Sequence, residues 1–150
     1  MEAESYADDE VSSFINENFV ALGAHLKEHP AYFHRFDAVW TPTVLVLDSD
    51  GVERQRLEGY LTKEEFRAWL EQGPARVAFM NKQWAEAERR YAQVAERYPQ
   101  SQAAPEAVYW KGVSHYKATN DHTALGATAD ELKQKYQGSV WAEKASVWAH

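Results

Sequence analysis

The stretch from Trp40 to Gly51 constrains the fold of this chain more than any other part of its sequence. Residues 43–47 are all β-branched or leucine, a pattern typical of a strand buried on both faces. Residues 48–51 are dense in turn formers, and residues 52–57 alternate in the manner of a second strand, so the sequence predicts a β-hairpin. Pro42 cannot donate a ladder hydrogen bond and therefore belongs at the first residue of its strand or at a bulge.

Four further elements are predicted along the first half of the chain. Asp8 or Asp9 can cap a helix, because apolar residues follow at spacings of three and four. Residues 19–22 form a short apolar run that predicts a strand, and His29-Pro30 opens a second helix, with proline tolerated in its first turn. Residues 62–65 read as a capping box, which begins a third helix that Gly73-Pro74 is expected to end.

Taken in order, Thr41-Pro42-Thr43, the apolar strand, the Asp/Gly turn, the second strand, Gly59-Tyr60-Leu61 and a helix resemble the C-terminal half of the thioredoxin fold. The segments Met1-Glu2, Asp8 to Val11 and Phe14 to Val20 resemble the part of thioredoxin-like proteins that directly follows the Cys-x-x-Cys motif. This resemblance covers roughly the first half of the chain and implies a cis proline whose loop faces that motif.

The resemblance also implies a binding site. In the family, the backbone of the residue before the proline pairs with an extended substrate, a form of strand addition. Trp40, Thr41 and Pro42 are therefore candidate substrate-binding residues. The alternative is that Pro42 only initiates a strand and contacts no ligand.

The chain departs from the family in one respect that bears on chemistry, because it contains no cysteine. Met1 falls where the family would be just past the second cysteine, and the strand that precedes the motif is absent as well. The chain as written cannot carry out thiol–disulfide exchange, and we assign no catalytic residue and no cofactor. A sheet without that strand could pair its remaining strands directly, be covered by a second copy, or be marginally folded. We favour a homodimer.

The second half carries helical periodicity and no strand signal. Sliding the chain by 38 residues lays residues 96–101 over residues 134–139, and small and large apolar residues recur at the same period. This half resembles a tetratricopeptide-type array, with turns at residues 81–87 and 120–125. The predicted architecture is thus an incomplete α/β thioredoxin-like domain (residues 1–73) followed by all-helical repeats (residues 74–150). Seven aromatic residues could line a partner groove or interlock in the core of the repeats, and we favour the core: Tyr98, Tyr109, Trp110, Tyr116, Tyr136, Trp141 and Trp148.

Charge and composition exclude several functions. Residues 1–73 carry a net charge of −9 and residues 74–150 of +2, without the clustered cations that nucleic-acid binding needs. No run approaches the roughly 20 apolar residues of a membrane helix. His25, His29 and His34 lack the carboxylate or cysteine that would complete a metal site. Asp48 and Asp50 resemble the start of a calcium loop that no glutamate closes, so we interpret them as turn residues.

Two functional hypotheses remain open at this point. The first is that the chain is part of a thiol–disulfide oxidoreductase whose cysteine pair precedes Met1, with helical repeats that hold protein partners. The second is a redox-inactive scaffold for protein or peptide partners. We expect a cytoplasmic location, although a signal upstream of a truncated start would be invisible.

Overall fold

The computed structural model describes residues 6–149, so the resemblance drawn from Met1-Glu2 lies outside the described residues. The chain divides into two compact units, Met1–Lys63 and Glu64–His150. Each unit is described by itself below.

The first unit contains two helices that the sequence predicts. Helix α1 (Asp9–Asn18) is capped by Asp8, whose Oδ1 accepts hydrogen bonds from the backbone N–H groups of Glu10 and Val11. Helix α2 (Pro30–Arg35) has the expected proline in its first turn. The strand predicted over residues 19–22 is wrong: this segment has no regular secondary structure, and its valine is fully exposed. Its β propensity is not realised because no strand of the described chain pairs with it.

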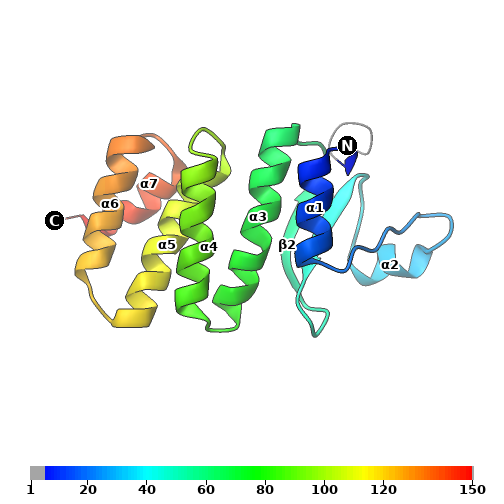
Figure 1. The fold of residues 1–150 in the computed structure, drawn as a ribbon, viewed down its shortest axis with the longest axis horizontal. Coiled ribbons are helices and arrows are strands. Elements are labelled where there is room, and N and C mark those ends of the chain that lie inside the picture. Colours follow the sequence, from blue (N-terminus) through cyan, green and yellow to red (C-terminus); the bar gives the residue numbers. More distant parts are fainter. Residues whose placement is uncertain (1–5, 150) are drawn as a thin grey trace. The chain divides into compact units, whose positions relative to one another are not determined.

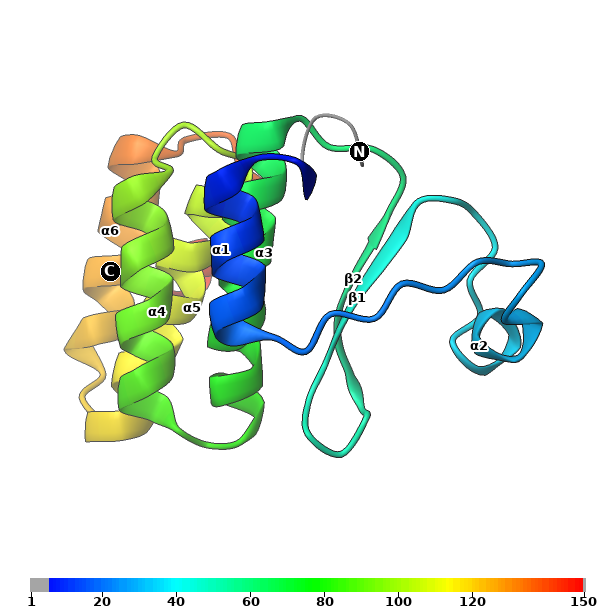
Figure 2. The same ribbon diagram turned by 45° about the vertical axis from the view of Figure 1, so that its right-hand side comes forward.

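The predicted hairpin is confirmed. Strand β1 (Thr43–Leu47) pairs antiparallel with strand β2 (Glu53–Glu58), and the two form a two-stranded sheet (Figure 2). A register shift between Val46 and Leu47 marks a bulge, and Gly51 takes the positive φ of 78° that its turn requires. Within β1 only Val46 is buried, so the expectation of a strand buried on both faces is wrong; the small sheet shields little of its own surface.

Helix α3 (Lys63–Met80) runs through Gly73-Pro74 without ending there, so the helix end predicted at these two residues is wrong. Proline disfavours a helical residue before it because its ring meets that residue's Cβ, and glycine has no Cβ to meet. Ala68 before the proline and Ala75 and Ala78 after it pack in the core of the second unit and hold the helix there. The domain boundary predicted at residue 73 lies inside α3.

The second unit is all-helical, as the sequence predicts. After α3 come α4 (Trp84–Arg97), α5 (Ala103–Thr119), α6 (Thr123–Lys135), α7 (Val140–Ala145) and the 3-10 turn Ser146–Trp148. Helices α4, α5 and α6 pack in sequence order, and α7 contacts both α5 and α6 (Figure 1). One core cluster joins α3, α4 and α5, and a second joins α5, α6 and α7. The turn predicted over residues 81–87 is shorter than expected because α4 already begins at Trp84.

The 38-residue period has a structural counterpart. Helices α4 and α6 both end at a tyrosine cap, Tyr98 and Tyr136, with similar backbone angles. Each tyrosine carbonyl accepts a hydrogen bond from a serine N–H three residues later, from Ser101 at 3.0 Å and from Ser139 at 3.1 Å. Equivalent residues therefore make equivalent turns in the two halves of the helical unit.

Candidate functional site

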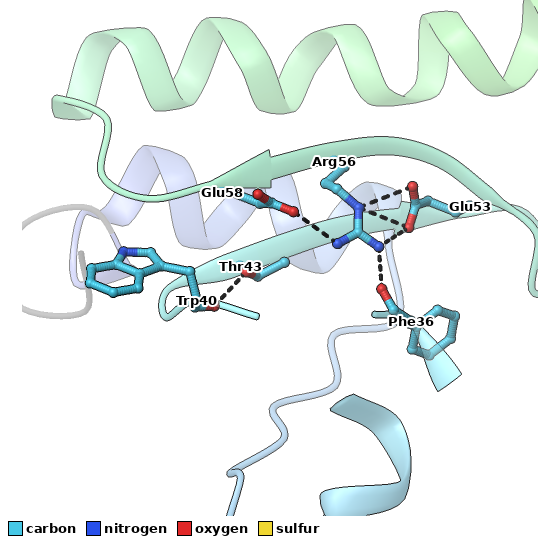
Figure 3. Close-up of polar contacts among 6 residues, drawn as sticks. All are labelled: Phe36, Trp40, Thr43, Glu53, Arg56 and Glu58. Carbon is cyan, nitrogen blue, oxygen red and sulfur yellow. Dashed lines mark hydrogen bonds and ion pairs between the residues drawn. The ribbon is translucent and has the colours of Figure 1, made fainter. Parts of the chain in front are cut away.

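The candidate residues Trp40, Thr41 and Pro42 form the loop between α2 and β1, and the Thr41–Pro42 peptide bond is cis, as the family resemblance implies. The side chain of Trp40 is 66% exposed. Two hydrogen bonds hold the loop: the Thr43 hydroxyl donates to the Trp40 carbonyl at 2.6 Å (Figure 3), and the Gly59 N–H donates to the Pro42 carbonyl at 2.8 Å. The loop is thus anchored by its backbone while its indole ring stays accessible.

The pairing of the hairpin determines which backbone groups of β1 face away from β2. In an antiparallel pair, residues that bond to the partner alternate with residues whose N–H and C=O point outward. The Pro42 carbonyl accepts from the Gly59 N–H, and the Asp48 N–H donates to the Val52 carbonyl, so both residues direct backbone groups toward β2. The even-numbered residues between them do the same. The odd-numbered residues therefore direct their backbone N–H and C=O groups to the opposite edge: Thr43, Leu45 and Leu47.

This outward edge of β1 has no strand beside it in the described part of the chain, where the sheet consists of β1 and β2 alone. Residues 43–47 carry no charged side chain that would discourage another strand from pairing with them. The edge therefore presents backbone donors and acceptors flanked by uncharged side chains, and the loop at Trp40 directly precedes it.

Arg56 on β2 is a site residue that the sequence analysis did not single out. Its guanidinium pairs with the carboxylates of Glu53 (Nη2–Oε1, 2.6 Å) and Glu58 (Nη1–Oε1, 3.1 Å), and it donates to the backbone carbonyl of Phe36 at the end of α2 (Figure 3). The hydrogen bonds with the two glutamates, that of Glu53 foremost, raise the pKa of Arg56 above its usual range. Arg56 thus ties the segment that leads into Trp40 to the hairpin.

A sequence signal for this cluster exists. Arg56 and Glu58 are two residues apart in a strand and therefore share one face of the sheet, where opposite charges attract. The bond to the Phe36 carbonyl carries no such signal, because it joins a side chain to a backbone atom 20 residues away in the chain.

Asp48 acts as a turn residue, in agreement with its interpretation from sequence. Its Oδ1 accepts from the N–H groups of Asp50 and Val52 at 2.9 and 3.0 Å, and its Oδ2 accepts from Arg54 Nε at 2.9 Å. The backbone hydrogen bond from Val52 is the main reason that the pKa of Asp48 lies below its usual range. Residues 6–149 contain no group of three or more His, Cys, Asp or Glu side chains placed to hold a metal ion.

The aromatic residues of the helical unit pack mostly as core. Six of the seven predicted residues pack against its two core clusters, all but Tyr116. Tyr109 and Trp148 stack with ring centroids 4.8 Å apart, and Trp110 lies edge-on to Trp141 at 6.3 Å. Interlocking core is therefore confirmed for these six, while Tyr116 lies against the ring of His122.

Charged side chains border this aromatic cluster. The Arg76 guanidinium lies 5.1 Å from the centre of the Trp110 ring, and Lys144 Nζ lies 4.1 Å from that of Trp141. Glu106 lies near both cations, and burial raises its pKa despite their attraction. The cluster therefore presents cations on aromatic rings at its margin.

Comparison with family models gives a match over residues 1–74, to a family described as a thioredoxin-like domain. The first half of the chain is therefore similar to thioredoxin-like domains. Neither the curated proteins nor the solved structures gave a match. The thioredoxin-like part contains the loop at Trp40, both strands and the Arg56 cluster, so every feature of the candidate site lies within the matched residues. The helical repeats lie outside this match. No helix within residues 6–149 is long and apolar enough to cross a membrane.

Proposed function

We propose that this protein binds extended segments of other proteins, by adding them as a strand to the outward edge of β1 beside the loop at Trp40. The observation that carries the proposal is the direction of the backbone groups of Thr43, Leu45 and Leu47, all on the side away from β2. Strand addition takes its affinity from such main-chain hydrogen bonds and its specificity from flanking side chains.

The side chains beside this edge favour an apolar occupant. Trp40 offers an exposed indole, and β1 offers only threonine, valine and leucine. Aromatic side chains supply large contact area with few rotamers to restrict, which makes Trp40 the expected anchor. The loop contains no thiol, imidazole or carboxylate, so its role is contact and alignment of a partner rather than proton transfer.

We further propose that the helical unit is a pair of tetratricopeptide-type repeats that holds protein partners. Support comes from the 38-residue period and from the matching ends of α4 and α6. Cations on the aromatic rings of Trp110 and Trp141 would favour partner segments with acidic residues.

The first experiment measures binding of a dye-labelled, end-blocked hexapeptide of alternating valine and threonine by fluorescence anisotropy. Trp40→Ala should weaken binding about tenfold or more, because an interface anchor is lost. Val20→Ala is the matched control, since it also removes an exposed apolar side chain of the first unit.

Peptides with N-methyl groups on alternate residues test the strand pairing directly, because an N-methyl group removes a backbone hydrogen-bond donor. One of the two methylation patterns should abolish binding, whereas equal loss with both patterns would argue against strand addition.

Thiol–disulfide exchange by a longer form of the protein is a second candidate function, and the thioredoxin-like match favours it. In that reaction a cysteine thiolate attacks a substrate disulfide, forms a mixed disulfide and expels a substrate thiolate. A second enzyme thiolate then attacks the mixed disulfide, which leaves the substrate reduced by two electrons and the enzyme oxidised. This chain supplies neither thiolate and would contribute substrate alignment at Trp40, Thr41 and Pro42.

The mass and free-thiol count of the protein isolated from its native source separate this candidate from a redox-inactive scaffold. A mass well above 17.2 kDa with two titratable thiols supports the oxidoreductase. A matching mass without thiols supports the scaffold. Fractionation of the same cells tests the predicted cytoplasmic location.

A further inference from the structure

Glu106 of α5 carries a charge opposite to that of the two cations in the aromatic cluster of the helical unit. It lies four residues before Trp110, so the two side chains share one face of the helix. The Arg76 guanidinium of α3 lies 5.1 Å from the centre of the Trp110 ring, and Lys144 Nζ of α7 lies 4.1 Å from that of Trp141. The two tryptophan rings are 6.3 Å apart. Helices α3 and α7 thus each bring one cation to the face of α5 that carries Glu106, and both cations attract its carboxylate.

In the described part of the chain, Arg76 and Lys144 form no ion pair with a carboxylate, and each cation rests on an aromatic ring instead. The charge of Glu106 therefore acts on them from beyond ion-pair distance. Lys144 is exposed and Arg76 is half-buried. Both groups carry several N–H donors, so donors remain for the carboxylates of a partner.

The net charge of this cluster depends on the state of Glu106. With its carboxyl ionised, Arg76, Lys144 and Glu106 sum to a single positive charge, and with the carboxyl protonated they sum to two. We infer that Glu106 is a switch at this site: the helical unit binds acidic partner segments tightly when Glu106 is protonated and weakly when it is ionised. An ionised Glu106 repels the carboxylates of the partner and offsets the attraction of the two cations. The inference rests on the acidic partners proposed above and states how their binding is regulated.

The surroundings of Glu106 make it the group of this cluster that titrates under mildly acidic conditions. Burial raises the pKa of Glu106 above its usual range, while the charges of Arg76 and Lys144 and a hydrogen bond from Gln72 act in the opposite direction. The titratable group that faces it from α4 is the phenol of Tyr91. Burial raises the pKa of Tyr91 as well, so the phenol stays protonated in this range.

A dye-labelled, end-blocked peptide of alternating aspartate and serine tests the switch by fluorescence anisotropy. Its aspartates stay mostly ionised between pH 7 and pH 5. The affinity of the unmodified chain should therefore rise about two- to fivefold over this range, the effect of one partly exposed charge. A peptide of alternating asparagine and serine is the control for charge and should not bind. Affinity for the aspartate peptide that stays constant or falls towards pH 5 would overturn the inference.

Glu106→Gln separates the switch from the histidines, which also gain charge over this range. The amide is uncharged at every pH, so this variant should bind the peptide about two- to fivefold more tightly than the unmodified chain at pH 7. The difference should shrink at pH 5. Glu96→Gln is the matched control, since it removes the same charge from an exposed position of α4. Equal affinity of Glu106→Gln and the unmodified chain at pH 7, or an equal gain from Glu96→Gln, contradicts the switch.

Carboxyl NMR of the unmodified chain covers the case in which Glu106→Gln does not fold. A partner that prefers the protonated form must raise the pKa of Glu106 when it binds, because the coupling is reciprocal. Titration of the Glu106 side-chain ¹³C signal with and without saturating peptide measures this shift. A pKa that the peptide leaves unchanged overturns the inference.

Lys144→Met separates failure of the switch from failure of the proposed function. This variant keeps the apolar stem and removes the cation, so it should weaken peptide binding at both pH values. Binding that depends on Lys144 and is the same for Glu106→Gln and the unmodified chain supports acidic partners and overturns the switch. Absence of binding by all of these proteins at both pH values overturns the acidic partners and the switch together.

Discussion

The two compact units of the chain differ in where their apolar side chains lie. Of the buried apolar residues in the described chain, two belong to the first unit, Val11 and Val46, and fifteen to the second. The exposed large apolar residues are distributed the other way, with nine in the first unit and three in the second. The second unit thus stabilises itself by its own core, whereas the first unit keeps apolar surface available for contact.

The largest expected effect comes from emptying the core of the second unit. Leu132 is fully buried between α5, α6 and α7, and Leu132→Ala should lower the free energy of unfolding by about 2–5 kcal/mol. Val20→Ala in the first unit, whose side chain is fully exposed, should change it by no more than about 0.5 kcal/mol. Urea denaturation followed by circular dichroism measures both. Equal effects would remove the contrast between the units.

The next effect concerns the close approach of α5 and α6. A Cβ at Gly112 would meet the Oγ1 of Thr128 at 1.9 Å, so Gly112→Ala should destabilise the second unit by about 1–3 kcal/mol despite the better helix propensity of alanine. Gly23→Ala is the control, because nothing lies within 4 Å of its added Cβ. Adding Thr128→Gly should recover part of the loss in a double-mutant cycle. Independent, additive effects would contradict the predicted contact.

Local sequence rules predict most elements of both units because short-range chemistry specifies them. The Asp8 cap, the proline at the start of α2 and the turn at Asp48 to Gly51 each depend on residues a few positions apart. The strand expected at residues 19–22 fails for the opposite reason, since a strand exists only with a neighbour to pair with. The helix end expected at Gly73-Pro74 fails because tertiary packing of α3 outweighs a local stop signal.

The candidate site is predictable only in part. The family resemblance points to Trp40, Thr41 and Pro42, and the alternation along a strand is implicit in any hairpin. The sequence does not reveal whether the odd-numbered or the even-numbered residues of β1 direct their backbone groups away from β2. That depends on the hydrogen bond from the Gly59 N–H to the Pro42 carbonyl. The contact of Arg56 with the Phe36 carbonyl is equally hidden, since it depends on the path of the chain after α2.

A smaller effect is expected from Arg56→Met, which keeps the apolar stem and removes the charge. Hydrogen bonds of a charged group contribute more than neutral ones, and the partly exposed pairs of Arg56 should contribute about 1–2 kcal/mol. We expect faster amide exchange around Phe36 to Thr43 and weaker peptide binding, with the helical unit unchanged. Arg89→Met, at an exposed ion pair of the second unit, is the control. Unchanged exchange in the loop would show that Arg56 does not hold it.

The smallest effect is a pH dependence within the second unit. Glu86 pairs with Arg89 and Arg90 on α4, and hydrogen bonds from these arginines, Arg89 foremost, lower its pKa to about 2. A folded-state pKa below the unfolded value means that the pairs stabilise the fold above pH 4.5, and that this stabilisation is lost as the pH falls towards 2. The carboxylate is more than a third exposed, so solvent screening keeps the contribution of each pair small. Glu86→Gln should therefore lower the unfolding free energy slightly at pH 7 and by a smaller amount near pH 2, as measured by urea titrations at both values. A difference that is as large at pH 2 as at pH 7, or that high salt fails to reduce at pH 7, would assign the effect to packing of the side chain rather than to its charge.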